Sequence, residues 1–178
     1  MILVRHAPPL VSGTCAGRSD IAVEPAGASA QIVLRALTAV PSAIVSSPSR
    51  RCHELAIELS RHLGLPLTLE PRAVELDFGE WEGLAWDEIR RADRSRFERW
   101  TANWRDEGPP GGESLLALQQ RVADWLGESA SSSPLAVTHA GVIRAARVLC
   151  GGQVWENALN EPVPYLVPVT FEAPSPLA

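Results

Sequence analysis

The chain begins with Met1-Ile2-Leu3-Val4-Arg5-His6-Ala7, an apolar run followed by a cation and an imidazole. A short apolar run that stops at a Pro-Pro pair, here Pro8-Pro9, is typical of a buried β-strand. Arg5 and His6 would then lie at its carboxyl end, the edge at which open α/β sheets bind ligands. Two polar residues can also end a strand without any function, so partners elsewhere in the chain decide their meaning.

The same pattern recurs at two later places. Residues 43–45 (Ala-Ile-Val) lead into residues 46–51 (Ser-Ser-Pro-Ser-Arg-Arg), and apolar residues at helical spacing follow over 52–63. Residues 135–138 (Leu-Ala-Val-Thr) lead into His139, and another helical pattern follows. Strands that alternate with helices predict a sheet covered on both faces. We therefore expect a three-layer α/β/α sandwich with a mostly parallel central sheet.

Other elements complete this picture. Spacing predicts helices over 25–40 and from residue 114 onward, a helical stretch over 84–106, and strands over 65–69 and 165–171. Four of the six tryptophans lie in residues 81–104, within a segment (76–112) that we interpret as a helical, lid-like insertion. Core packing is the simpler explanation of these tryptophans, and a wall for a ring-bearing ligand is the alternative. We expect one domain over residues 1–171 and a flexible tail over 172–178.

Composition excludes several classes of protein. The net charge is -5, so no general nucleic-acid footprint is expected. Three cysteines at wide spacings suggest neither a disulfide framework nor a zinc site. No apolar stretch approaches the length of a membrane span, and the short apolar start lacks a basic region before it. We expect a cytoplasmic protein with no membrane partner, acting as a monomer or a homodimer.

The polar residues at the strand ends have a shared chemistry. Arg5, His6, Arg51 and His139 would converge if their three strands were neighbours in the sheet. A guanidinium binds two phosphate oxygens at once, and a helix amino terminus, where Arg51 would lie, also favours an anion. A neutral histidine can attack phosphorus, and nearby arginines would lower its pKa. A carboxylic acid such as Glu75 could protonate the leaving alkoxide.

Five blocks of sequence resemble, in order, those of the histidine phosphatase superfamily, the phosphoglycerate mutase-like enzymes. They are residues 4–7 (Val-Arg-His-Ala), 46–51 (Ser-Ser-Pro-Ser-Arg-Arg), 75–83 (Glu-Leu-Asp-Phe-Gly-Glu-Trp-Glu-Gly), 111–114 (Gly-Gly-Glu-Ser) and 138–144 (Thr-His-Ala-Gly-Val-Ile-Arg). Each block alone is weak evidence, whereas five in order are strong evidence. The resemblance implies a metal-independent phosphomonoester hydrolase that needs no cofactor and acts on a small phosphorylated metabolite.

The resemblance also implies roles for single residues. His6 would be the nucleophile that becomes phosphohistidine. Glu75 would act first as the acid and then as the base that activates water. His139 would complete the catalytic set.

A phosphate-binding set is implied as well. It comprises Arg5, Arg51 and His139, together with Arg18, which lies in a Gly-Arg-x-Asp block. The chain departs from the family where Ala7 and Ala140 replace glycines and where Pro9 and Ser12 replace a threonine and an asparagine. Loss of the asparagine puts one phosphate contact in doubt.

Residues 13–20 and 75–83 most resemble the α-ribazole phosphatases of cobalamin nucleotide-loop assembly. This resemblance implies α-ribazole 5'-phosphate as the substrate. The alternatives are a broad-specificity sugar or metabolite phosphatase and a phosphoglycerate mutase-like enzyme. A protein of another class, which binds a phosphorylated ligand without turnover, is a further alternative.

Overall fold

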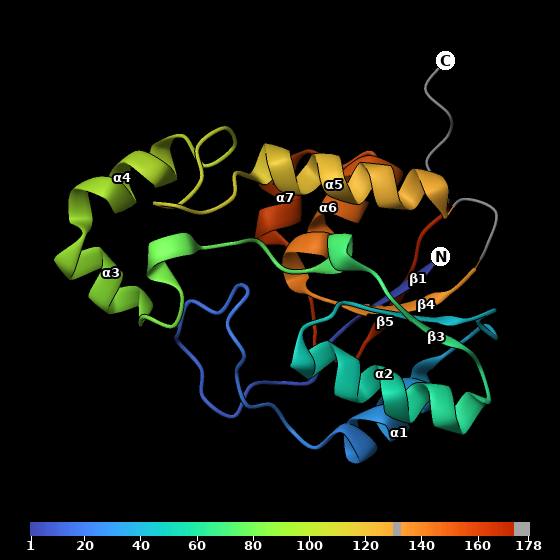
Figure 1. Ribbon diagram of the computed structural model, residues 1–178. Coiled ribbons are helices and arrows are strands. Elements are labelled where there is room, and N and C mark those ends of the chain that lie inside the picture. The colour runs from blue at the N-terminus through green and yellow to red at the C-terminus, as the bar shows by residue number, and fades with distance from the viewer. Residues whose placement is uncertain (130–132, 173–178) are drawn as a thin grey trace.

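The central sheet has five strands in the order β3-β2-β4-β1-β5 (Figure 1). A computed structural model describes residues 1–129 and 133–172. The strands are β1 (Ile2–Arg5), β2 (Ile44–Ser46), β3 (Leu67–Leu69), β4 (Leu135–Thr138) and β5 (Pro168–Thr170). The first four run parallel, and β5 pairs antiparallel with β1 at the sheet edge. The mostly parallel sheet is thus confirmed.

Helices cover both faces of this sheet (Figure 1). One face carries α1 (Ala26–Ala36) and α2 (Arg50–Leu63), and the other carries α5 (Leu115–Glu128), α6 (Ala140–Gly151) and α7 (Trp155–Asn160). Alternate residues of β1 explain why two layers form. Ile2 and Val4 are buried against the α1–α2 layer, while Leu3 is buried against the α5–α6 layer. The predicted α/β/α sandwich is therefore confirmed.

The segment between β3 and α5 projects beyond the end of the sheet (Figure 1). It contains two short 3₁₀ turns, η1 (Pro71–Ala73) and η2 (Gly79–Trp81), and two helices, α3 (Trp86–Ala92) and α4 (Arg94–Ala102). The segment builds a small core of its own, in which buried Trp81 and Ile89 pack with Cys15 from the loop after β1.

Two helix predictions need correction. The helical stretch over 84–106 is broken at Asp93, whose φ of -128° is not helical and whose carboxylate accepts a hydrogen bond from Trp81 Nε1 (2.8 Å). The helix predicted over 25–40 ends at Ala36, because Leu37 is extended and leaves Val40 88% exposed.

Two further findings concern the limits of the chain. Apart from Glu172, the predicted tail lies outside the described residues. No helix within residues 1–129 and 133–172 is long and apolar enough to cross a membrane.

Candidate active site

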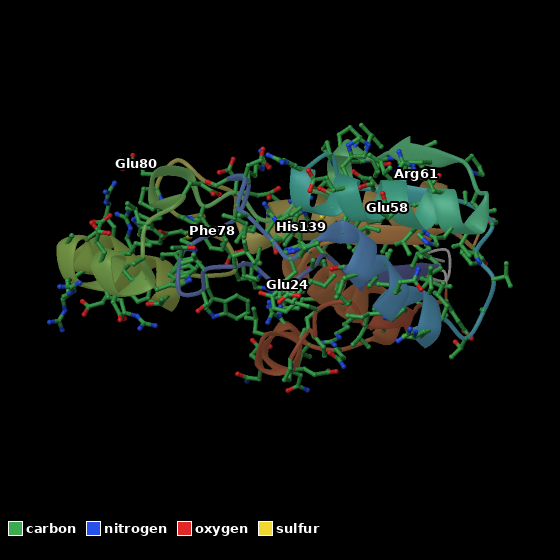
Figure 2. All side chains as sticks on the ribbon, turned by 90° about the horizontal axis from the view of Figure 1, so that it is seen from below. Glu24, Glu58, Arg61, Phe78, Glu80 and His139 are labelled. Carbon is green, nitrogen blue, oxygen red and sulfur yellow. The ribbon has the colours of Figure 1, made fainter. Side chains whose placement is uncertain are left out.

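Three neighbouring strands deliver the predicted residues to one point. Since β4 lies between β2 and β1, their carboxyl ends are side by side. Two backbone hydrogen bonds continue the sheet there: His6 N–H donates to Thr138 O and Ser47 N–H donates to Val137 O, both at 3.0 Å. The His6 and His139 rings consequently meet with their centroids 5.2 Å apart. Figure 2 shows His139 in the interior and Phe78 toward the projecting α3–α4 segment.

Arg51 joins the two histidines from the first turn of α2. Its Nε lies 3.3 Å from His6 Nε2, and its Nη2 lies 3.2 Å from His139 Nδ1. The same guanidinium donates to the carbonyl oxygens of Gly17 and Ser19, in the loop after β1. Only 2% of Arg51 is exposed. These three residues form what we call the histidine–arginine cluster (His6, Arg51 and His139).

His6 is held in its neutral form. Its Nδ1 lies 2.7 Å from Ala7 O, which can only accept a hydrogen bond, so Nδ1 carries the proton. Nε2 therefore carries the lone pair, and it accepts a hydrogen bond from Arg51 Nε. Burial, followed by the charge of Arg51, lowers the pKa of His6 from 6.5 to about 3. Near neutral pH the ring thus has the form that attacks an electrophile.

His139 is fully buried, and both of its ring nitrogens have partners. Nδ1 accepts from Arg51, so Nε2 carries the proton and donates to Ser47 Oγ at 2.9 Å. Burial lowers the pKa of His139 well below its usual value, and the charge of Arg51 lowers it further. Cys52 Sγ also lies 3.4 Å from Nε2. In this arrangement His139 fixes the orientation of Arg51.

Glu75 reaches the same region from the loop after η1. Its carboxylate accepts from Gly141 N–H, at 3.0 Å for Oε1 and 3.2 Å for Oε2, and from Leu76 N–H at 2.9 Å. Gly141 lies in the first turn of α6, where unpaired N–H groups favour an anion. A Cβ at Gly141 would lie only 2.2 Å from Glu75 Oε1, so a glycine is required for this approach.

Arg121 on α5 is a residue of this site that the sequence did not single out. It donates to the backbone oxygens of Val74 (2.8 Å) and Glu75 (3.1 Å), and it forms a bidentate ion pair with Glu113 at 2.7 and 2.8 Å. Arg121 therefore fixes the loop that carries Glu75. Its position beside buried Val122 was the available signal, because a charge at the border of an apolar helix face needs a partner.

Glu82 is a second missed residue. Its carboxylate accepts from the backbone N–H groups of Arg18 (2.8 Å), Ser19 (3.0 Å) and Phe78 (3.1 Å). It thereby ties the loop after β1 to the projecting segment. Gly17 allows this close packing, since a Cβ there would lie 2.1 Å from Leu76 O.

The two other predicted phosphate ligands lie apart from the cluster contacts. Arg18 is 45% exposed at its side chain and pairs with Asp77 (3.1 Å) and Glu113 (3.7 Å). Arg5 points toward the segment before β5, where it donates to Tyr165 Oη at 2.8 Å. Burial lowers the pKa of Arg5. The charges of Arg51 and, more weakly, Arg5 both lower the pKa of His6.

A cavity of about 280 Å³ opens beside Glu75 and is largely aromatic. We call it the aromatic cavity; its walls include Phe78, Trp86, Trp100, Trp104 and Trp155, with Leu76, Leu115 and Leu159. Arg144 is the one cation in this lining, and its Nε donates to Ala158 O at 3.1 Å. Trp81 is instead buried in the small core of the projecting segment. Core packing thus holds for Trp81, whereas Trp86, Trp100 and Trp104 line a cavity and their role toward a ring-bearing ligand stays a prediction.

Comparison with known families agrees with this geometry. Residues 1–165 match the family model of the histidine phosphatase superfamily, branch 1. The chain belongs to this superfamily. It is a phosphatase, as are the named relatives to which its sequence is similar.

Two of these relatives have different substrates in their names. The chain is 32% identical over 167 residues to "Putative phosphoserine phosphatase 2" of Hydrogenobacter thermophilus, covering 90% of this chain and 82% of the relative. It is 30% identical over 141 residues to the glucosyl-3-phosphoglycerate phosphatase of Mycolicibacterium vanbaalenii, covering 71% and 60%. The fold is similar to that of the α-ribazole phosphatase from Shigella flexneri, with a TM-score of 0.81, 23% identity and coverage of 94% and 87%.

Proposed function

We propose that this phosphatase hydrolyses phosphomonoesters through a phosphohistidine at His6. Nε2 attacks phosphorus as the ester P–O bond breaks, and the acid form of Glu75 gives its proton to the departing oxygen. Water then attacks phosphorus, the N–P bond breaks, and the Glu75 carboxylate takes a proton from that water. Inorganic phosphate and the starting form of His6 result.

The hydrogen bond between His6 Nδ1 and Ala7 O, which leaves the lone pair on Nε2, is the observation that carries this proposal. Ala7 O keeps the proton on Nδ1, so it also stabilises the positive charge that the ring acquires once Nε2 is phosphorylated. Arg51 lies against Nε2 and suits the phosphoryl oxygens that would arrive there. We assign Arg5 to the same phosphoryl group. His139 would join it by turning its Nε2 N–H from Ser47 Oγ to a phosphoryl oxygen, and half-exposed Arg18 would bind the phosphate or another part of the substrate. Because these cations balance the charge, the proposed reaction needs no metal ion.

The first experiment is to trap the covalent intermediate. Wild type, His6→Ala and the control His62→Ala, which removes an exposed histidine of α2, are mixed with an aryl phosphate and quenched in alkali, where phosphohistidine survives. We expect one phosphorylated peptide, containing His6, in wild type and the control. We expect activity to fall by about 10⁴-fold or more in His6→Ala, as for loss of other nucleophiles. Full activity in His6→Ala, or inactivation of wild type by a chelator, would contradict the mechanism.

For the substrate we propose α-ribazole 5'-phosphate, as used in cobalamin biosynthesis. The aromatic cavity beside Glu75 supports this choice, since a planar benzimidazole can pack on indole and phenyl rings. Arg144 would donate a hydrogen bond to a polar atom of the same leaving group.

A second candidate is a substrate whose leaving group bears a carboxylate. Arg144 favours it, because a guanidinium in an apolar cavity binds a carboxylate well. Phosphoserine and glucosyl-3-phosphoglycerate, the substrates in the names of the two relatives, both carry one.

Kinetics with a panel of esters separates the candidates. We expect the highest kcat/KM for α-ribazole 5'-phosphate over phosphoserine, phosphoglycerates and sugar phosphates, and a modest loss in Arg144→Gln. A preference for phosphoserine or phosphoglycerate that disappears in Arg144→Gln would instead support the carboxylate substrate. Net transfer of the phosphoryl group to a second position of phosphoglycerate would indicate a mutase.

A further inference from the structure

The side chain of Arg5 is enclosed by a short segment before β5. Nη1 donates to Val163 O and Nη2 donates to Tyr165 Oη, both at 2.8 Å. The guanidinium carbon also lies 3.7 Å from the centroid of the Tyr165 ring, which is cation–π geometry. A single residue, Tyr165, thus holds the cation by both its hydroxyl and its ring.

The backbone of the same segment is fixed to the strand that carries Arg5. Leu166 N–H donates to Arg5 O at 3.1 Å, and the Leu166 side chain is 4% exposed. Leu166 has a φ of 61°, a left-handed conformation that bulky residues rarely adopt. It is the only non-glycine residue with a positive φ in residues 1–129 and 133–172. Such a conformation persists where surrounding contacts enforce it, and it is found most often at functional sites.

The guanidinium of Arg5 keeps N–H groups that these contacts do not use. Its Nε is buried and has no hydrogen-bond partner among the described residues. A buried N–H without a partner is costly unless a ligand supplies the acceptor. The Tyr165 ring centroid is also 5.7 Å from that of His6, so the segment borders the nucleophile as well as the cation.

We propose that Tyr165 is a positioning residue, which holds the Arg5 guanidinium so that its free N–H groups can bind the phosphoryl group on His6. This inference rests on the proposed function, since it takes Arg5 as a phosphate ligand. The contacts of Val163, Tyr165 and Leu166 with Arg5 fix its position before the substrate binds. Binding phosphate then costs less side-chain entropy than it would with a free arginine.

The test is a double-mutant cycle on phosphate binding. Titration calorimetry with inorganic phosphate is carried out on wild type, Tyr165→Phe, Arg5→Ala and the double variant. Tyr165→Phe keeps the ring and removes only the hydroxyl. We expect it to weaken phosphate binding about tenfold, the lower end of the range for loss of one hydrogen bond to a charged group. In the Arg5→Ala background the same change should have almost no effect, because the residue that it orients is gone.

Two results would overturn the proposal, and they differ in what they leave standing. An equal effect of Tyr165→Phe in both backgrounds would show that Tyr165 acts independently of Arg5, and the phosphate role of Arg5 would stand. Unchanged phosphate affinity in Arg5→Ala would remove that role itself, whereas the phosphohistidine experiment would still test His6. Melting temperatures of the four proteins show whether a variant is folded.

Tyr165 is also the only tyrosine of the chain, so fluorotyrosine labels this position alone. We expect its single fluorine NMR signal to shift when phosphate is added and to shift much less in Arg5→Ala. A signal that ignores phosphate in the wild-type background would also contradict the proposal.

Discussion

Glu75 lines the aromatic cavity and binds Gly141, two residues after His139 of the histidine–arginine cluster, and these two regions are built in opposite ways. The cluster is made of buried polar groups at strand ends, with hydrogen bonds to ring nitrogens and backbone carbonyls. The cavity is made of large apolar side chains from the projecting segment and from α5–α7, held by packing. The hydrogen bonds of the cluster therefore depend on each of its members, whereas single side chains of the cavity can be replaced without breaking a hydrogen bond elsewhere in it.

This difference predicts how each region responds to substitution. Removing one member of the cluster leaves another buried polar group without its partner, which costs free energy in addition to the lost chemistry. Removing one wall of the cavity changes its shape and apolar area. We therefore expect the cluster to determine whether turnover occurs and the cavity to determine which ester is preferred.

After the loss of the nucleophile in His6→Ala, the largest effect is expected between the two regions, from Gly141→Ala. The new Cβ would lie 2.2 Å from Glu75 Oε1, so the carboxylate has to leave its place at the α6 amino terminus. We expect kcat for an alkyl phosphate to fall about 100-fold, as for other displaced general acids. A nitrophenyl phosphate should lose much less, because its leaving group needs no proton. Steady-state kinetics with both esters measures this difference.

Gly151→Ala is the matched control on the same helix. A Cβ at Gly151 meets no atom within 4 Å, so wild-type rates are expected. An equal loss for both esters in Gly141→Ala would mean that the substitution damages the cluster and not the acid. Unchanged rates would show that Glu75 does not need its contact with Gly141.

A smaller effect is expected from Trp104→Ala on the cavity side. Truncation removes an aromatic wall, so KM for a ring-bearing ester should rise about tenfold, given the usual worth of an aromatic contact and its buried area. For glycerol phosphate, which cannot reach across the cavity, KM should change little. The variant Trp104→Phe should recover most of the loss. If both esters lose equally, the cavity does not receive the leaving group.

The strand-end residues show what sequence can predict. His6, Arg51 and His139 could be placed together because each follows an apolar run, and parallel strands align their carboxyl ends. Glu75 was a candidate acid from its chemistry, its specific role came from the family resemblance, and its contact with Gly141 could not be foreseen. The strand order that makes β1, β4 and β2 neighbours is a property of the whole chain, and the sequence left it as a condition for convergence.

The residues that were missed act over long distances in sequence. Arg121 and Tyr165 each contact a segment far away in the chain, and no periodicity connects them with their partners. Helix α7 was not predicted, because it spans only Trp155–Asn160 and is too short for a clear helical pattern. Asp93 breaks a helical stretch because its side chain binds Trp81, a tertiary contact that outweighs local propensity. Helix boundaries and positioning residues depend on such contacts.

The smallest expected effect concerns stability at low pH, and it tests the neutral state of the cluster. His6 titrates at 6.5 when unfolded and at about 3 when folded, so below pH 6.5 the unfolded chain binds the extra proton. Stability from this group is therefore present above pH 6.5 and is lost as the pH falls toward 3. One pH unit below 6.5 the loss of unfolding free energy from His6 is about 1 kcal/mol, with a further loss from buried His139.

Denaturant unfolding of wild type, His6→Asn and the control His62→Asn at several pH values measures this loss. The difference in unfolding free energy between wild type and His6→Asn should shift by this amount over that pH unit, in favour of the variant. A difference that does not vary with pH would show that His6 keeps its ordinary pKa in the folded enzyme, and burial and Arg51 would then not hold the ring in its neutral form.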